Sequence, residues 1–190
     1  MKVLLINGSP NKAGSTYTAL KEITTVLTEE QIEWEIFHIG NKAVRGCIGC
    51  EHCRNTGTNA CIFNDDVCNE MIKKMLEADG IVIGSPVYYA GPNGALCALL
   101  DRAFYSSQYA MKHKPAAAVF TCKRQGGTAS MDRINKYFSI SEMPIVTAQY
   151  WNTVIGITPE ALQNDQYGFS FMQTIGKNMA WMLKKLCCNE

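Results

Sequence analysis

The sequence has no long apolar run, no excess of charge of one sign and few histidines. No apolar stretch among its 190 residues approaches the roughly 20 that a helix needs to cross a bilayer. Lysine and arginine number 18 against 17 aspartates and glutamates, and no basic stripe is present. The three histidines have no carboxylate or nucleophile in register with them. We therefore expect no membrane span, no nucleic-acid partner and no hydrolytic triad.

The N-terminus also lacks the charged, apolar and small-residue pattern of an export signal, so we expect a cytoplasmic protein. No repeat, linker or shift in composition divides the chain, and residues 1–190 are expected to form one α/β domain. Cysteine, by contrast, is abundant, with nine residues. In a chain without an export signal, metal or redox use of some of them is a better interpretation than disulfides.

Residues 4–16 combine a short strand, a polar loop and the start of a helix. Residues 4–6 are apolar, glycines and a proline interrupt the following stretch, and a Ser-Thr pair stands where a helix N-cap belongs. The free first-turn N–H groups and the helix dipole, about half a positive charge, make such a loop an anion site. The pattern contains neither Gly-x-Gly-x-x-Gly nor a Lys-Ser/Thr ending, so it suits a mononucleotide such as FMN. An ordinary turn between a strand and a helix is the alternative.

Strand-like and helix-like stretches alternate along the rest of the chain. We expect further strands at about 34–39, 80–85, 116–122 and 144–148, and helices near 15–30, 65–76, 96–104, 131–138 and 167–187. This alternation predicts a three-layer α/β/α fold with a five-stranded parallel sheet. Cys68 falls on an apolar helix face and is expected in the core. Cys187 and Cys188 are expected to be a frayed helix end rather than a redox pair.

Ligands of such sheets bind beyond the C-terminal ends of the strands. That rule selects the segments 8–16, 86–91 and 121–128. Free backbone N–H groups in the second segment would reach the edge of a flavin ring. Gly126 and Gly127 would let the backbone approach the ring, and Tyr88 and Tyr89 would contact it. Packing of the two tyrosines against a helix is the alternative.

Two of these motifs resemble a known family. Residues 8–16 are similar to the phosphate loop of the NADPH-dependent FMN reductase group within the flavodoxin-like fold. Residues 85–89, followed by Leu-Asp-Arg at 100–102, resemble that group's ring-binding loop and the end of its next helix. The resemblance covers nearly the whole chain and implies a sheet in the order 2-1-3-4-5. Asn11 stands where an Arg or Lys often follows the loop proline, which leaves a neutral donor there.

The resemblance also implies a binding site and a reaction. At the FMN phosphate it implies Ser9, Asn11, Ser15 and Thr16, and around the ring Pro86, Val87, Tyr88, Tyr89, Ala90, Thr121, Gly126 and Gly127. It implies hydride transfer from NAD(P)H to the flavin, and then reduction of a quinone, a flavin or a similar small acceptor. Members usually form homodimers or homotetramers. Trp151 would lie over the flavin or, as we favour, at a contact between subunits.

A second motif, Cys-x2-Cys-x2-Cys-x7-Cys, lies in a long irregular insertion at about 40–64. Its members are Cys47, Cys50, Cys53 and Cys61. Four thiolates are what an iron–sulfur cluster requires, although four also bind zinc, and a loop without metal or with disulfides is a further alternative. The motif resembles that of the iron–sulfur flavoproteins, a branch of the same FMN group, which implies a [4Fe-4S] cluster exchanging electrons with FMN. The longer last gap sets Cys61 apart from the other three.

These observations predict an FMN-dependent oxidoreductase that takes electrons from NAD(P)H. The alternative is an iron–sulfur flavoprotein that acts as an electron carrier rather than as a reductase. A flavin-binding regulatory module is a third interpretation.

Overall fold

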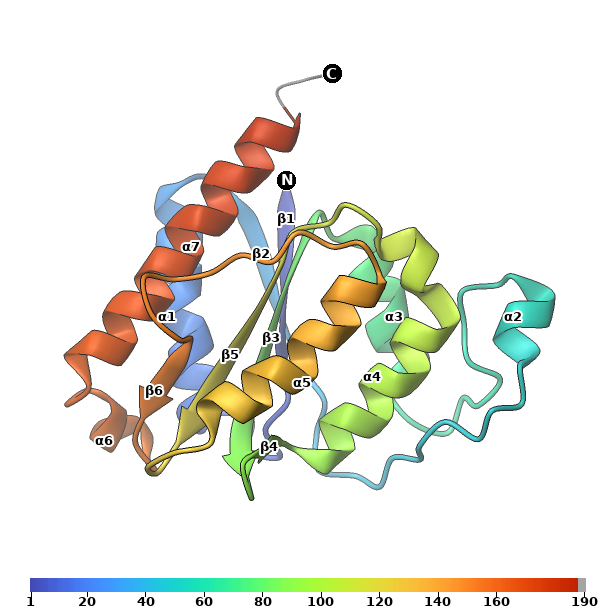
Figure 1. Ribbon diagram of the computed structural model, residues 1–190, viewed down its shortest axis with the longest axis horizontal. Helices are drawn as coiled ribbons and strands as arrows, with labels where there is room; N and C mark the ends of the chain where they lie inside the picture. The colour runs from blue at the N-terminus through green and yellow to red at the C-terminus, as the bar shows by residue number, and fades with distance from the viewer. Residues whose placement is uncertain (188–190) are drawn as a thin grey trace.

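The computed structural model describes residues 1–187, and its centre is a parallel sheet with helices on both faces (Figure 1). The parallel strands are β1 (Lys2–Asn7), β2 (Glu33–His38), β3 (Gly80–Tyr88), β5 (Ala116–Cys122) and β6 (Thr153–Ile155). They lie in the order β2-β1-β3-β5-β6, which confirms the predicted flavodoxin-like arrangement of five strands. A two-residue strand, β4 (Gly91–Pro92), pairs antiparallel with the end of β3.

Two groups of helices cover the sheet. On one face lie α1 (Ser15–Glu29) and α7 (Gln166–Cys187), with the short α6 (Pro159–Leu162) beside them. On the other face lie α3 (Cys68–Glu77), α4 (Gly94–Ser107) and α5 (Gly127–Ile140). The short α2 (His52–Thr56) lies apart from both groups, beyond α4, and a 3₁₀ turn spans Gln108–Met111 (Figure 1). No helix within residues 1–187 is both long and apolar enough to cross a membrane.

The apolar strands are explained by burial on both of their faces. In β1, Val3 and Leu5 face the α1–α7 side, whereas Leu4 and Ile6 face the α3–α5 side, and all four are fully buried. A parallel sheet covered on both faces needs such continuous apolar runs. Cys68 is buried in the α3–α5 core, as predicted.

The prediction of a strand at 144–148 is wrong. In this stretch Ile145 makes a single isolated bridge to Ala116, and the edge strand of the sheet is β6. The reason lies in Asn152. Its side-chain amide donates to the Ala118 carbonyl at 2.9 Å, and its backbone carbonyl accepts from the Phe120 amide at 2.9 Å. Pro144 and Val146 bond only to Ala116 at the start of β5, and the bonds of Asn152 attach the chain to β5 again, so that continuous pairing forms at residues 153–155.

Three smaller boundaries also differ from the sequence expectations. The predicted loop at 86–91 begins as the continuation of β3, the irregular cysteine segment contains α2, and α3 begins at Cys68 rather than at residue 65. Cys187 is the last described residue of α7, whereas Cys188 lies outside the described residues.

Candidate functional site

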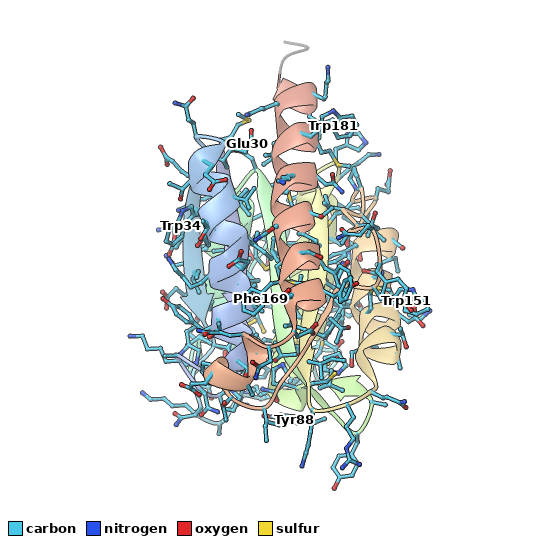
Figure 2. All side chains as sticks on the ribbon, turned by 90° about the vertical axis from the view of Figure 1, so that its left-hand side faces the viewer. Glu30, Trp34, Tyr88, Trp151, Phe169 and Trp181 are labelled. Atoms are coloured by element: carbon cyan, nitrogen blue, oxygen red, sulfur yellow. The ribbon has the colours of Figure 1, made fainter. Side chains whose placement is uncertain are left out.

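The three predicted ligand-binding segments meet in one cavity at the C-terminal ends of the strands. It has a volume of about 790 Å³ and is lined by residues 9–16, 86–88 and 121–123, together with 156–159, His38 and Asn41. Figure 2 shows Tyr88 at this end of the sheet. Eight of the twelve predicted cofactor ligands therefore line a single cavity: Ser9, Asn11, Ser15, Thr16, Pro86, Val87, Tyr88 and Thr121.

The loop between β1 and α1 is shaped by Asn7, the buried last residue of β1. Its side-chain carbonyl accepts from the Ser9 amide at 3.1 Å, and its side-chain amide donates to the Lys12 carbonyl at 3.2 Å. The Ser9 hydroxyl accepts from the Asn11 amide at 3.1 Å, and His38 Nε2 donates to the Ser9 carbonyl at 2.9 Å. These bonds hold the loop in one conformation without help from a ligand.

The loop ends at a helix N-terminus that is open toward the cavity. Gly14 is the N-cap of α1 and so supplies no side-chain cap, and the first turn contains no acidic residue. Ser15 Oγ is buried and has no hydrogen-bond partner, although buried hydroxyls are almost always paired. Thr16 Oγ1 lies 3.0 Å from Thr121 Oγ1, which ties the first turn of α1 to the end of β5. The free amides, the helix dipole and the unpaired hydroxyl together suit an anion.

The ring-binding segment is a hairpin rather than an open loop. Val87 pairs with Pro92 and Tyr88 with Gly91, which leaves Tyr89 and Ala90 as a two-residue turn. Both turn residues have positive φ, 49° and 59°, as a type I′ turn requires. Tyr89 and Ala90 are exposed and do not line the cavity. The turn therefore leaves these two predicted ring ligands outside the cavity that contains the phosphate loop.

Gly126 and Gly127 line a neighbouring cavity and not this one. The second cavity, of about 610 Å³, is lined by both glycines and by the aromatic residues Tyr150, Trp151, Tyr167 and Phe171. Gly126 has a φ of 99°, and a Cβ there would lie 2.8 Å from the Ala90 Cα. The lack of a side chain at Gly126 thus allows the segment after β5 to pack against the tip of the hairpin.

Sequence reasoning missed the residues that connect these segments. Asn93, the N-cap of α4, donates from its side chain to the Gly8 carbonyl at 2.8 Å, and its backbone amide donates to Ser85 Oγ at 2.9 Å. It joins the phosphate loop to the hairpin. Its signal in the sequence was an asparagine directly before a helix, whereas nothing local marked Asn7 or His38 as loop-shaping residues.

The four cysteines of the motif line one small enclosed cavity beside α4, together with Arg102 and Tyr105. Cys47 and Cys50 are exposed, Cys53 and Cys61 are half-buried, and all four are free thiols. Within residues 1–187, no three His, Cys, Asp or Glu side chains lie close enough together to hold one metal ion. Thiolates on a single zinc stand only about 4 Å apart, given Zn–S bonds of about 2.3 Å in a tetrahedron.

Comparisons with known proteins agree with this geometry. The family model for NADPH-dependent FMN reductases matches residues 1–156. The chain belongs to the NADPH-dependent FMN reductase family. An iron–sulfur flavoprotein of Methanocaldococcus jannaschii is 36% identical to it over 192 residues, covering 97% of this chain and 98% of the relative.

Two solved structures show the same fold at 14% identity. RosB with a bound intermediate matches with a TM-score of 0.78, covering 100% of this chain and 81% of that one. An archaeal flavodoxin matches with a TM-score of 0.63, covering 97% of this chain and 99% of that one. The family model and the iron–sulfur flavoprotein relative confirm the family resemblance found in the sequence, and this member of the FMN reductase family is an FMN-dependent oxidoreductase.

The strand-end cavity suits the FMN of this family. A phosphate needs hydroxyl and amide donors without competing partners, and Ser15 Oγ and the first-turn amides of α1 meet that need. The cavity continues from this loop to residues 86–88 and Thr121, so it reaches a part of each of the three expected segments, while Tyr89, Ala90, Gly126 and Gly127 lie outside its lining.

Four thiols are the donor set that either an iron–sulfur cluster or a zinc ion requires, and within residues 1–187 no three such groups lie close enough for one shared ion. The ligands of a cubane bind four separate irons and therefore stand farther apart than ligands of a single ion. Beside them, burial is the largest single influence on Arg102 and opposes its charge, but the hydrogen bonds to Asp66 and Cys61 and the neighbouring negative charges together raise the pKa of the guanidinium. Burial is also the largest single influence on Asp66 and opposes its charge, but Arg102 and the backbone amides of Cys68 and Arg45 together lower the pKa of that carboxyl.

Proposed function

We propose that this chain passes electrons from NAD(P)H to a small acceptor, such as a quinone or a flavin, through FMN held in the strand-end cavity. The observation that carries the proposal is Ser15 Oγ, a buried hydroxyl without a partner at an uncapped helix N-terminus inside that cavity. Bound FMN would supply the hydride chemistry, so no nucleophilic side chain is required.

The residues of the chain would bind and orient the cofactor. Ser15 and the first amides of α1 would donate to the phosphate, with Ser9, Asn11 and Thr16 beside them. Pro86, Val87 and Tyr88 would line the ring, and the Thr16–Thr121 hydrogen bond would hold the two sides of the cavity together. The proposed contacts of Tyr89 and Ala90 would need the turn of the hairpin to move, because both lie outside the cavity.

We further propose that Cys47, Cys50, Cys53 and Cys61 hold a [4Fe-4S] cluster. Four free thiols around one enclosed cavity support it, and the iron–sulfur flavoprotein relative supports it independently. A cluster would supply one-electron transfer to or from the flavin.

Absorbance after anaerobic purification tests both cofactors. We expect flavin bands together with a broad cluster shoulder, and rapid bleaching of the flavin by NAD(P)H. Protein that stays colourless after incubation with FMN would contradict the function, and flavin bands without the shoulder would contradict the cluster alone. Replacing Cys50 with Ser should remove the shoulder and leave the flavin bands, whereas replacing Cys97, which lies outside the cysteine cavity, should change neither.

An electron carrier is the second candidate. The exposure of Cys47 and Cys50 favours it, because a redox protein could approach a cluster at that surface. Flavin bleaching by a reduced ferredoxin but not by NAD(P)H would support the carrier over the reductase.

We also propose that the chain assembles into dimers or tetramers. Tyr150, Trp151 and Tyr167 are more than half exposed and border the second cavity, and Trp151 lies at the side of the molecule in Figure 2. Large exposed apolar side chains gathered in one place are typical of interfaces. Light scattering of the FMN-loaded protein should give a mass above that of one 21.1 kDa chain, and Trp151→Arg should lower it.

A further inference from the structure

Cys61, the cysteine that the spacing sets apart, is held more firmly than its position in a long segment indicates. Its amide donates to Asn69 Oδ1 at 2.8 Å, and its carbonyl accepts from Asn69 Nδ2 at 2.8 Å. Its sulfur accepts a hydrogen bond from Nε of Arg102 at 3.3 Å. Backbone and sulfur are thus anchored by α3 and α4, which lie in the core and not in the loop.

Arg102 has no freedom to place its Nε elsewhere. Its side chain is 1% exposed, and it projects from α4 into the base of the cysteine segment. Nη1 donates to the Asp66 carboxylate and to the Arg45 carbonyl at 3.2 Å, and Nη2 donates to the Phe63 carbonyl at 3.3 Å. A buried guanidinium requires such partners, and because the group is planar, these bonds also fix the direction of its Nε–H. The Nε–H is the donor directed at Cys61.

The sign of the effect on a cluster follows from charge. Adding one electron to a cluster increases the negative charge on its sulfur ligands, and no proton transfer is needed to balance the step. A cationic donor on one sulfur stabilises the reduced form more than the oxidised form. The guanidinium is shielded from solvent, so counterions screen this interaction only weakly.

We propose that Arg102 is a positioning residue that holds Cys61 as the fourth cluster ligand and raises the reduction potential of the cluster through its Nε–H bond. The proposal rests on the cluster put forward as part of the function. It gives the Leu-Asp-Arg segment at 100–102 a role on the cluster side of the molecule, in addition to its place on the helix that follows the ring hairpin.

The test compares reduction potentials in variants loaded anaerobically with iron and sulfide. Arg102→Met together with Asp66→Asn removes the donor without leaving a buried carboxylate unpaired, and Arg102→Lys keeps the charge but not the fork. Arg45→Met is the matched control, because Arg45 pairs with Asp65 and donates no hydrogen bond to Cys61. Dithionite titrations followed by electron paramagnetic resonance should show a roughly tenfold lower equilibrium constant for one-electron reduction in Arg102→Met/Asp66→Asn, which is about 59 mV. Arg102→Lys should show a smaller decrease, because it keeps the charge but loses the Nε–H bond. Arg45→Met should keep the wild-type value.

The outcomes separate this proposal from the proposed function. A wild-type chain that takes up no iron would overturn the cluster itself. A loaded wild type whose potential equals that of the Arg102 variants would overturn the role of Arg102 alone. Arg102 variants that bind FMN normally but lose the cluster, with Arg45→Met fully loaded, would support the positioning of Cys61. If the double variant fails to fold, the potential of Arg102→Lys decides the question.

Discussion

Replacing Ser15 with alanine should weaken FMN binding without destabilising the protein that lacks FMN. In the ligand-free chain, Ser15 Oγ is buried and unpaired, so removing it breaks no protein hydrogen bond. Hydrogen bonds to charged groups contribute about 1.5–3 kcal/mol, so the loss of one bond to the phosphate should raise the Kd of FMN by about 10- to 150-fold. Because an unpaired buried hydroxyl is itself unfavourable, the free energy of unfolding of the ligand-free protein should stay unchanged or rise by up to about 1 kcal/mol.

The assay is a titration of ligand-free protein with FMN, followed by quenching of flavin fluorescence, with urea unfolding measured in parallel. Ser141→Ala is the matched control, since Ser141 Oγ is also buried and unpaired but does not line the strand-end cavity. It should change unfolding in the same direction and leave the Kd of FMN unchanged. A Ser15→Ala protein that binds FMN as tightly as the wild type would refute the placement of the phosphate at α1.

Three further predictions concern the backbone conformation of a glycine, a buried ion pair and the burial of a thiol. Gly126→Ala should lower the free energy of unfolding, measured in urea, by about 1–3 kcal/mol, because the φ of 99° and the close packing at Gly126 both disfavour a Cβ. Gly94→Ala is the control and should not lower it, because a Cβ at Gly94 meets nothing within 4 Å. Asp66→Asn should destabilise the protein by about 3–5 kcal/mol at pH 7 by leaving buried Arg102 without its counter-ion. Since the folded pKa of Asp66 lies below its usual 3.8, the stability from this pair is present above pH 3.8 and is lost as the pH falls through the lowered pKa. The difference in free energy of unfolding between wild type and Asp66→Asn, measured in urea, should therefore narrow from pH 7 to pH 3. A constant difference would contradict the ion pair. Burial raises the pKa of Cys68 to about 12, so mass spectrometry after brief iodoacetamide treatment of cluster-free protein at pH 9 should find it unmodified while the exposed Cys47 and Cys50 react.

The phosphate loop and most of the strand and helix positions could be predicted because short stretches of sequence carry their signals. The apolar runs of β1, β3 and β5 and the periodic faces of α1 and α7 depend on which residues are buried, and burial repeats with the period of each element. Strand order and the location of the cavity then follow from the alternation of strands and helices. The prediction that the cofactor is FMN depended on the family resemblance.

Other features were decided by partners far along the chain, which no local pattern reports. Residues 144–148 have a strand-like composition, but Asn152 and its bonds to β5 select residues 153–155 as the edge strand. The turn at residues 89–90 takes positive φ without glycine or asparagine, because pairing of β4 with β3 imposes it.

Cys61 shows most clearly the difference between what the local sequence indicates and what distant partners decide. The sequence by itself determined that four thiols lie within fifteen residues of one another and that a helix with Leu-Asp-Arg follows much later. Only the tertiary structure places Arg102, 41 residues away, with its Nε–H on the Cys61 sulfur. A buried guanidinium must have its donors satisfied, and the chain satisfies them with the base of the cysteine segment, so core packing decides how that segment is held.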